Sequence, residues 1–317
     1  MVLALIAALL AAGIALPHVL DLRRVPAMTA SLIWAGGLTL RALAGAALIA
    51  YVVLVFPATG LFTAVTHWCW HTVLPVLTTH LGFDGHRLGG VVVLLPAALV
   101  TASMLSVALG LARAARSVRR LVSHGTADGP DGSVIVPERG VVLAAAGVSR
   151  PRVVVSTGAL LALDDEELAA GLAHEQAHIA RRHRWILLYA EACRGLSVFL
   201  PGARHAVRHL SHHLERDADV WALRGHDRLA LAGAICKATV GSRSTVAFVP
   251  LTGDVGARAR IEELLVLQPA LSSARLLGVR ACAASVLILA IGLTLTLPVA
   301  VAQASAGGAP LLRHCLG

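Results

Sequence analysis

The sequence predicts a mainly α-helical membrane protein in which an α+β domain is inserted between the third and fourth of four transmembrane helices. Hydrophobic residues make up 57% of the 317 residues and charged residues only 14%, proportions outside the range of ordinary soluble domains. The apolar residues also gather in long runs near both ends of the chain, whereas the middle third mixes apolar and charged residues. These observations place the membrane spans at the ends and the soluble part in the middle.

Four segments are apolar enough to cross a bilayer, and each has about the 20 residues that a roughly 30 Å hydrocarbon core requires. They run approximately over residues 2–20, 36–57, 88–112 and 276–302. The first segment has no basic residues directly after Met1 and is followed by further spans. It is therefore predicted to be an uncleaved anchor rather than a secretory signal.

The arginines predict the orientation of these spans. The formal net charge is +9, and Lys237 is the only lysine. Arginines cluster beside the apolar segments, at Arg23, Arg24, Arg113, Arg116, Arg119, Arg120, Arg275 and Arg280. The positive-inside rule puts these clusters in the cytoplasm. Because topology accounts for the basic residues, we expect no direct nucleic-acid binding, although phosphate backbones also attract chains with a pI near 10.5.

The expected organisation is that of a multi-pass cell-membrane protein. Residues 1–112 are predicted to form an N-terminal membrane domain with three spans and an extracytoplasmic loop at 58–87. Residues 113–275 are predicted to form a cytosolic domain, 276–302 the fourth span and 303–317 a short extracytoplasmic tail. The lipid bilayer is thus one predicted partner, and nothing in the sequence indicates the oligomeric state.

A few residues of the membrane part need separate interpretation. Arg41, in the second span, is expected to snorkel near a helix end, with a signal-coupling charge as the alternative. Trp68 and Trp70, in the 58–87 loop, are expected at the membrane interface. The five cysteines show neither CxxC pairs nor a dense even spacing, so they predict neither a thiolate metal site nor a disulfide scaffold.

The middle of the chain opens with a linker rich in Gly, Asp and Pro at 125–133. Three β-branched runs follow and predict a small strand meander: Val134–Val136, Val141–Leu143 and Val153–Val155. Asp164 with Glu167 forms a capping-box pattern ahead of a helix from Asp165 to about Arg184. Further helices are predicted over 186–199, 203–224 and 228–240, with Pro201 and Gly225 as breaks.

The string HEQAH at 174–178 lies within the predicted capped helix. Residues four apart share a helix face, so His174 and His178 can direct two imidazoles at one Zn²⁺ ion. Glu175, one step round the helix, is placed beside the water that the metal activates, where it can act as general base. Spacing and helical context together predict metal-assisted hydrolysis of peptide bonds.

A catalytic zinc takes three protein ligands, so a third ligand is expected downstream. The string HLERDADVWAL at 213–223 offers Glu215, with Asp219 four residues later on the same helix face. We expect Glu215 as the third ligand and Asp219 as a supporting residue that fixes the tautomer of a ligand histidine. The rival candidates for the third position are nearby histidines, namely His205, His209, His212 and His213.

The residues 151–184, PRVVVSTGALLALDDEELAAGLAHEQAHIARRHR, resemble the strand-loop-helix core of membrane gluzincins of the HtpX and CAAX prenyl protease type. The arrangement of three spans, HExxH, ExxxD and a late fourth span looks closer still to the BlaR/MecR antirepressor peptidases. The resemblance implies a zincin domain with His174, His178 and Glu215 as ligands, Glu175 as base and Asp219 behind the ligands. It also implies that the strand near Val153–Ser156 is the edge that holds an extended substrate.

The resemblance also has a limit, because BlaR/MecR receptors carry a penicillin-binding sensor domain after the last span. In this chain only a short tail follows the fourth span, without an SxxK motif, so β-lactam sensing is not predicted. The expected activity is a membrane-embedded zinc endopeptidase that cuts a cytosolic or membrane protein. By family analogy, a BlaI-like transcriptional repressor is one candidate substrate.

Two other classes of function are alternatives. A non-catalytic membrane signalling protein would use zinc as a structural staple, but structural sites are usually closed by four protein ligands. A transporter or channel would account for the hydrophobicity alone, but the sequence shows no paired intramembrane charges and no broken inverted repeats. The sequence therefore favours the enzyme.

Overall fold

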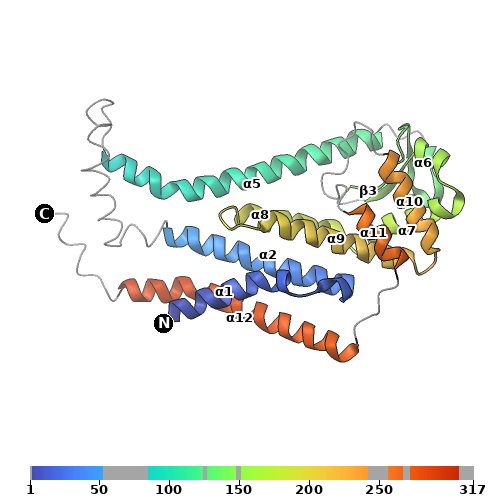
Figure 1. Cartoon of the computed structure of the whole chain (residues 1–317). Coiled ribbons are helices and arrows are strands. Elements are labelled where there is room, and N and C mark those ends of the chain that lie inside the picture. The colour runs from blue at the N-terminus through green and yellow to red at the C-terminus, as the bar shows by residue number, and fades with distance from the viewer. Residues whose placement is uncertain are drawn as a thin grey trace.

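The computed structural model describes residues 2–52, 85–123, 127–147, 151–241, 256–266 and 272–306. Its helices are α1 (Val2–Val19), α2 (Ala27–Ala50), α5 (Gly85–Ser123), α6 (Thr157–Ala162), α7 (Asp165–Ala180), α8 (His183–Leu196), α9 (Ala203–Ala222), α10 (Arg228–Gly241), α11 (Ala257–Leu265) and α12 (Ser273–Ala306). Its strands are β1 (Ala127–Asp128), β2 (Val134–Val136), β3 (Leu143–Ala146) and β4 (Arg152–Ser156). The long helices run side by side, and the sheet lies with α6, α7, α10 and α11 at one end of them (Figure 1).

Three helices of the described chain are long and apolar enough to cross a membrane, which agrees with three of the four predicted spans. The apolar stretches are Ala27–Ala50 of α2, Leu94–Ser117 of α5 and Ser273–Leu295 of α12. The first predicted span forms helix α1 (Val2–Val19), and the apolar stretch of it that is described with its side chains is Ala8–Val19. Most of the predicted 58–87 loop, with Trp68 and Trp70, lies outside the described residues, as do Cys69, Cys315 and residues 307–317.

Helix α2 begins nine residues before the predicted start of the second span. Pro26 is its N-cap, and the helix continues without interruption from Ala27 to Ala50. Arg41 therefore lies well inside the helix, where it is only 2% exposed. The prediction that Arg41 snorkels near a helix end is wrong, because Arg41 lies nine residues before the end of α2 and its side chain is buried against His18 of α1 and Gly202 at the start of α9.

Helices α8 and α9 form an antiparallel pair that packs along α2 and α5. One apolar core joins them to α2, through Trp34 and Leu38 of α2, Leu187 of α8, and Leu210 and Leu214 of α9. The turn between the two helices reaches the second half of α2, where Gly45 lies against the backbone of Leu196. The helix that carries Glu215 is thus anchored against an apolar helix that is long enough to cross a membrane.

The sheet has the order β1-β2-β4-β3, with β2 parallel to β4 and β3 antiparallel to β4. The predicted meander is therefore wrong, since β2 pairs with β4 rather than with the next strand along the chain. Val153, Val154 and Val155 are all buried, as befits a strand in the middle of a sheet. The residues Val153–Ser156 are consequently not the edge that the resemblance implied, and the edge beside α7 is β3.

The helices around the sheet follow the predicted pattern with one break. The capping box is confirmed, because Asp164 accepts from the Glu167 N–H at 2.8 Å and Glu167 accepts from the Asp164 N–H at 3.1 Å. The predicted helix to Arg184 ends at Ala180, since Arg182 adopts a left-handed φ of 56° and starts α8. Helices α6 and α11 were not predicted, and α11 contributes to the site below.

The close approach of Gly45 to Leu196 predicts that the α8–α9 turn is sensitive to added volume in α2. A Cβ at position 45 would lie 2.6 Å from the Leu196 carbonyl oxygen, a backbone atom that cannot rotate away. Gly45→Ala should lower stability by about 1–3 kcal/mol, the range for overpacking. Gly110→Ala in α5 is the matched control, because a Cβ there meets nothing within 4 Å. Equal thermal unfolding midpoints for the two variants in detergent would contradict this packing.

Candidate metal centre

Helix α7 presents His174 and His178 on one face, one turn apart. Both side chains are buried, and their Nε2 atoms lie 3.2 Å from each other. The capping box fixes the start of the helix and Ala170, Leu172 and Ala177 pack into the domain, so the two imidazoles are held on a rigid element. Two nitrogen donors thus point at the same place, as the spacing of HEQAH predicted.

Glu215 of α9 completes the group. Its Oε2 lies 3.3 Å from the His174 Nε2, and its Oε1 lies 3.5 Å from the His178 Nε2. All three ligand atoms lie within 4.8 Å of one another, and all three residues are buried. Zinc–ligand bonds of about 2.0–2.1 Å at tetrahedral angles separate donor atoms by about 3.3 Å. The separations of 3.2 Å between the two nitrogens and of 3.3 Å between the His174 Nε2 and the Glu215 Oε2 match this value, and the other oxygen of Glu215 faces His178. Two nitrogens and one carboxylate are a donor set that Zn²⁺ prefers.

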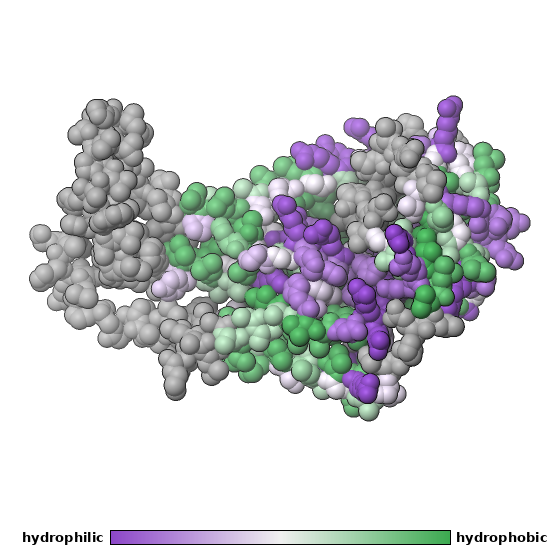
Figure 2. All heavy atoms as spheres, viewed as in Figure 1, coloured by the Kyte–Doolittle hydropathy of each residue, from purple (hydrophilic) through white to green (hydrophobic). Residues whose placement is uncertain are grey.

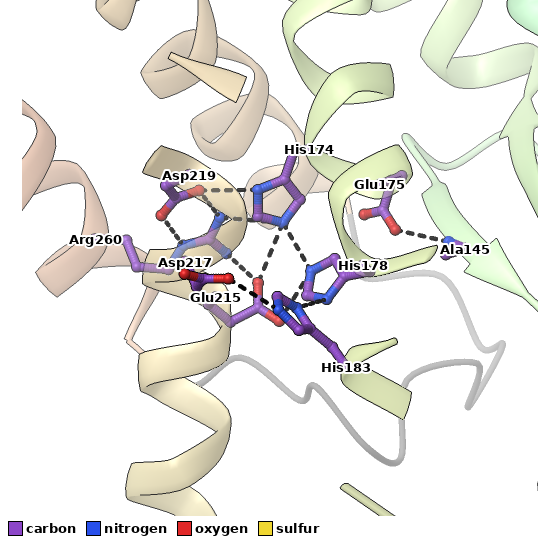
Figure 3. Close-up of polar contacts among 9 residues, drawn as sticks. All are labelled: Ala145, His174, Glu175, His178, His183, Glu215, Asp217, Asp219 and Arg260. Carbon is purple, nitrogen blue, oxygen red and sulfur yellow. Dashed lines mark hydrogen bonds and ion pairs between the residues drawn. The ribbon is translucent and has the colours of Figure 1, made fainter. Parts of the chain in front are cut away.

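Asp219 and Arg260 lie behind the first of these ligands (Figure 3). The Asp219 Oδ1 is 2.9 Å from the His174 Nδ1, the nitrogen that faces away from Glu215. Arg260 of α11 donates from two nitrogens to the two Asp219 oxygens, at 2.6 and 2.9 Å, and from a third to the Glu215 Oε2 at 2.8 Å. The guanidinium therefore fixes Asp219, which in turn orients the imidazole of His174.

A second carboxylate of α9 supports His178 through another histidine. The His183 Nδ1 lies 3.0 Å from the His178 Nδ1, and the His183 Nε2 lies 3.1 Å from the Asp217 Oδ2. Asp217 is also paired with the guanidinium of Arg181. Each ligand imidazole thus has its outer nitrogen held by α9, directly through Asp219 or indirectly through Asp217.

Glu175 lies beside the group but does not join it. Its carboxylate points toward β3, where Oε2 accepts a hydrogen bond of 2.6 Å from the Ala145 N–H (Figure 3). Because β3 pairs antiparallel with β4 on its other side, the backbone groups of Ala145 and Leu143 face away from β4. The edge strand and the acidic residue next to the two histidines are therefore in direct contact.

Burial and neighbouring charges set the ionisation of the centre. Burial lowers the pKa of His174, but the carboxylates of Asp219 and Glu215 outweigh it and raise that pKa to about 9. Burial lowers the pKa of His178 to about 3. Burial tends to raise the pKa of Glu215, but His174 and Arg260 hold it well below its usual range. Burial raises the pKa of Glu175, which favours its use as a proton acceptor near neutral pH.

The four histidines considered as rival ligands lie elsewhere. His212 faces Glu263 at 3.6 Å, and the His213 Nδ1 lies 3.0 Å from Arg216. His205 and His209 contact each other and stack near Trp34 of α2. Among the described residues, the group that can hold a metal consists of His174, His178 and Glu215.

Four residues that contact the candidate metal centre were not predicted from the sequence, namely Arg181, His183, Asp217 and Arg260. His183 lies in the quoted string 151–184, and Asp217 lies in the quoted string 213–223. The presence of a second aspartate on α9 beside Asp219 could have indicated a second residue that orients a ligand histidine. Arg260 had no such signal, because it lies 41 residues after Asp219 on a short helix of ordinary composition. Only the packing of α11 brings it to the site.

Residues 111–223 of the chain match Peptidase family M48. The matched segment includes the sheet, α7 and α9, and therefore all three residues of the candidate metal site. Comparisons with the curated proteins and with the solved structures gave no match. Metallopeptidases of family M48 typically use zinc, which agrees with the donor set at the site. The 111–223 segment is thus related to the zinc metallopeptidases of family M48.

Proposed function

We propose that this protein is a membrane-embedded zinc endopeptidase of the gluzincin type. The observation that carries the proposal is the convergence of two imidazole Nε2 atoms and the Glu215 carboxylate at separations of 3.2, 3.3 and 3.5 Å. His174, His178 and Glu215 would hold the metal. When bound, zinc supplies Lewis-acid polarisation of the scissile carbonyl and makes water a better nucleophile.

Glu175 performs the proton transfers in this proposal. Its carboxylate takes a proton from the attacking water and later gives it to the leaving amine. Burial raises the pKa of Glu175, which makes its carboxylate a stronger base than that of an exposed glutamate and suits it to accept the proton. The Ala145 N–H lowers that pKa, so a substrate that takes over this N–H would make Glu175 a stronger base.

The free edge of β3 is the proposed binding surface for the substrate backbone. Leu143 and Ala145 offer N–H and C=O groups on the side away from β4, directly beside α7. An extended peptide that pairs with this edge adds a strand to the sheet and passes the metal ligands. This placement replaces Val153–Ser156, which lie in the middle of the sheet.

The physiological substrate belongs to the same proposal. An active site placed on the cytoplasmic side by the arginines that flank the spans would reach cytosolic proteins and the exposed parts of membrane proteins. The resemblance to the BlaR/MecR antirepressor peptidases supports a BlaI-like repressor, and with it a role in signal transduction. Quality control of a membrane protein is the other candidate. A structural zinc site in a non-catalytic signalling protein is less favoured, since the described ligand set has three members with an acid beside it.

Glu175→Gln should abolish proteolysis and leave the zinc content near one per chain, since Glu175 is not a ligand. We expect a loss of at least about 100-fold, the lower range for general base catalysis. Proteomic comparison of cells that express wild type or variant should show fragments only with wild type, and a co-expressed BlaI-like repressor is one substrate to follow. Cleavage that is equal in both would remove the catalytic role, and an intact repressor beside other cleaved proteins would remove only that substrate.

Zinc binding should release about one proton per ion at pH 7, because the metal-free centre keeps His174 protonated up to a pH of about 9. The affinity for zinc should rise with pH and level off near pH 9. By the same linkage, protonated His174 stabilises the metal-free protein below pH 6.5, and this contribution is lost as the pH rises toward 9. Calorimetric titration in buffers of different ionisation enthalpy measures the release, and Asp219→Asn should reduce it. Zinc affinity that is independent of pH between 6 and 8 would contradict the protonated centre.

Arg260→Gln should weaken zinc binding by about 10- to 100-fold, the usual effect of removing a residue that orients a ligand. The variant loses the paired hydrogen bonds to Asp219 and the contact to Glu215. Arg258→Gln is the matched control on the same helix, because Arg258 is almost fully exposed and, among the described residues, its ion pair is with Glu262. Competition with a fluorescent zinc chelator gives both affinities. Equal values for the two variants would show that Arg260 does not support the centre.

A further inference from the structure

Arg41 is a buried cation without a carboxylate partner among the described residues. Its guanidinium contacts the His18 Nε2 at 3.0 Å and the Gly37 carbonyl oxygen at 3.5 Å. The Nε atom is buried and has no hydrogen-bond partner there, and the side chain is only 2% exposed. Burying an unpaired charge is costly, so a guanidinium in such a place indicates a missing anion.

Other hydrogen-bond donors surround Arg41. Trp34, two turns earlier on α2, is buried, and its Nε1 also has no partner within the described chain. His18 packs edge-on against Trp34 at 4.9 Å, and its ring stacks on that of His205 at 5.2 Å. His18 and His205 are both exposed, so they form the outer side of a site whose floor is Arg41.

The first turn of α9 contributes to the same site. Gly202, the N-cap of α9, has a left-handed φ of 86° and the helix has no side-chain cap. The first N–H groups of a helix have no partner within it and carry a partial positive charge. A Cβ at position 202 would lie 3.5 Å from the Arg41 NH2, so the guanidinium sits against this turn. A cation at the positive end of a helix is unfavourable unless an anion binds both.

Two exposed arginines lie on the same turns of α9. Arg204 and Arg208 form no ion pair with any described residue. Hydrophilic residues gather over α8 and α9, between the hydrophobic surfaces of α5 on one side and of α12 on the other (Figure 2). The site therefore has a buried charge at its floor and further positive charge at its rim, with apolar helices on both sides.

Helices α5 and α12, which flank this site, are longer than a bilayer core. Their 39 and 34 residues correspond to about 58 and 51 Å of helix, against about 30 Å for a hydrocarbon core. Gly195 of α8 packs against Met104 of α5, so α5 continues past the α8–α9 turn for about 28 Å (Figure 1). Arg41 and Met104 both lie within the stretches of α2 and α5 that are long and apolar enough to cross a membrane, so the site lies beside these two helices.

We propose that Arg41, His18, His205 and the first turn of α9 bind a phosphate group. The shared chemistry fits two sources, the headgroup of an anionic phospholipid and free phosphate. Charge-assisted hydrogen bonds from a guanidinium and from a helix N-terminus are the usual means of holding such a group. Because α9 also carries Glu215 and Asp219, one continuous helix connects this site with the candidate metal centre.

The test uses the full-length protein in detergent, titrated with phosphatidylglycerol or with phosphatidylcholine and analysed by native mass spectrometry. Wild type should bind the first phosphatidylglycerol at least about tenfold more tightly than phosphatidylcholine, as expected for a hydrogen-bonded charge. Arg41→Gln should remove this preference. Arg204→Gln with Arg208→Gln tests the exposed rim and does not depend on how the core tolerates a change at Arg41. Arg152→Gln, an exposed arginine on β4, is the control for the loss of one positive charge.

Inorganic phosphate is the second arm of the test. If millimolar phosphate displaces phosphatidylglycerol from wild type, or binds alone and not to Arg41→Gln, free phosphate is the ligand and the site stands. If phosphate has no effect and the lipid preference depends on Arg41, the ligand is the lipid headgroup. The proposal would be overturned if wild type bound both lipids equally and phosphate had no effect. It would also be overturned if Arg152→Gln reduced the preference for phosphatidylglycerol as much as Arg41→Gln and the Arg204→Gln/Arg208→Gln double variant do. Zinc content serves as the folding control and is independent of these outcomes.

Discussion

The structure depends on the meeting of α7 and α9 through buried polar groups. Two imidazoles of α7 face one carboxylate of α9 in the interior, beside an apolar cluster that contains Ala170 of α7 and Ala222 of α9. Buried charges are tolerated only when they are paired, and here each one has a partner within about 3.5 Å. Leaving any of these buried charged groups unpaired would raise the free energy of the folded protein. This explains why so many charged side chains gather at one site.

The supporting residues show a consistent arrangement. Helix α9 supplies three acids in one stretch, and each has a distinct partner: Glu215 faces both Nε2 atoms, Asp219 holds the outer nitrogen of His174, and Asp217 holds His183 behind His178. Arg260 and Arg181 neutralise the outer two. With both outer nitrogens held, the Nε2 atoms are the ring nitrogens that face the centre, which is the orientation that a metal ligand requires.

The position of α9 also connects the metal centre with the apolar part of the molecule. Its first turns lie beside α1 and α2 near Arg41, and its last turns carry the acids of the site. A rigid helix that is packed along α2 transmits a shift at one end to the other, because its interior contacts leave little room for independent movement. An occupant at the first turn and a metal at the last turns would therefore act on the same element.

The sequence by itself determined the local features. The capping box and the four-residue spacing of HEQAH predicted α7 and the two histidines on one face, and the four-residue spacing of Glu215 and Asp219 predicted their common face on α9. The long apolar runs predicted four spans, and three helices of the described chain are able to cross a membrane. These features depend on helical periodicity and capping, which act over a few residues and can be recognised in a single sequence.

Only the tertiary structure decided which residues that are distant in the chain contact one another. The order of the strands, the exposed edge at β3, the burial of Arg41 and the contact of Arg260 with the site all join residues that are distant in the chain. Such contacts are set by packing and by the pairing of buried charges, and neither leaves a periodic trace in the sequence. Periodicity therefore predicted the residues of the candidate metal site, whereas packing determined which residues hold them in place.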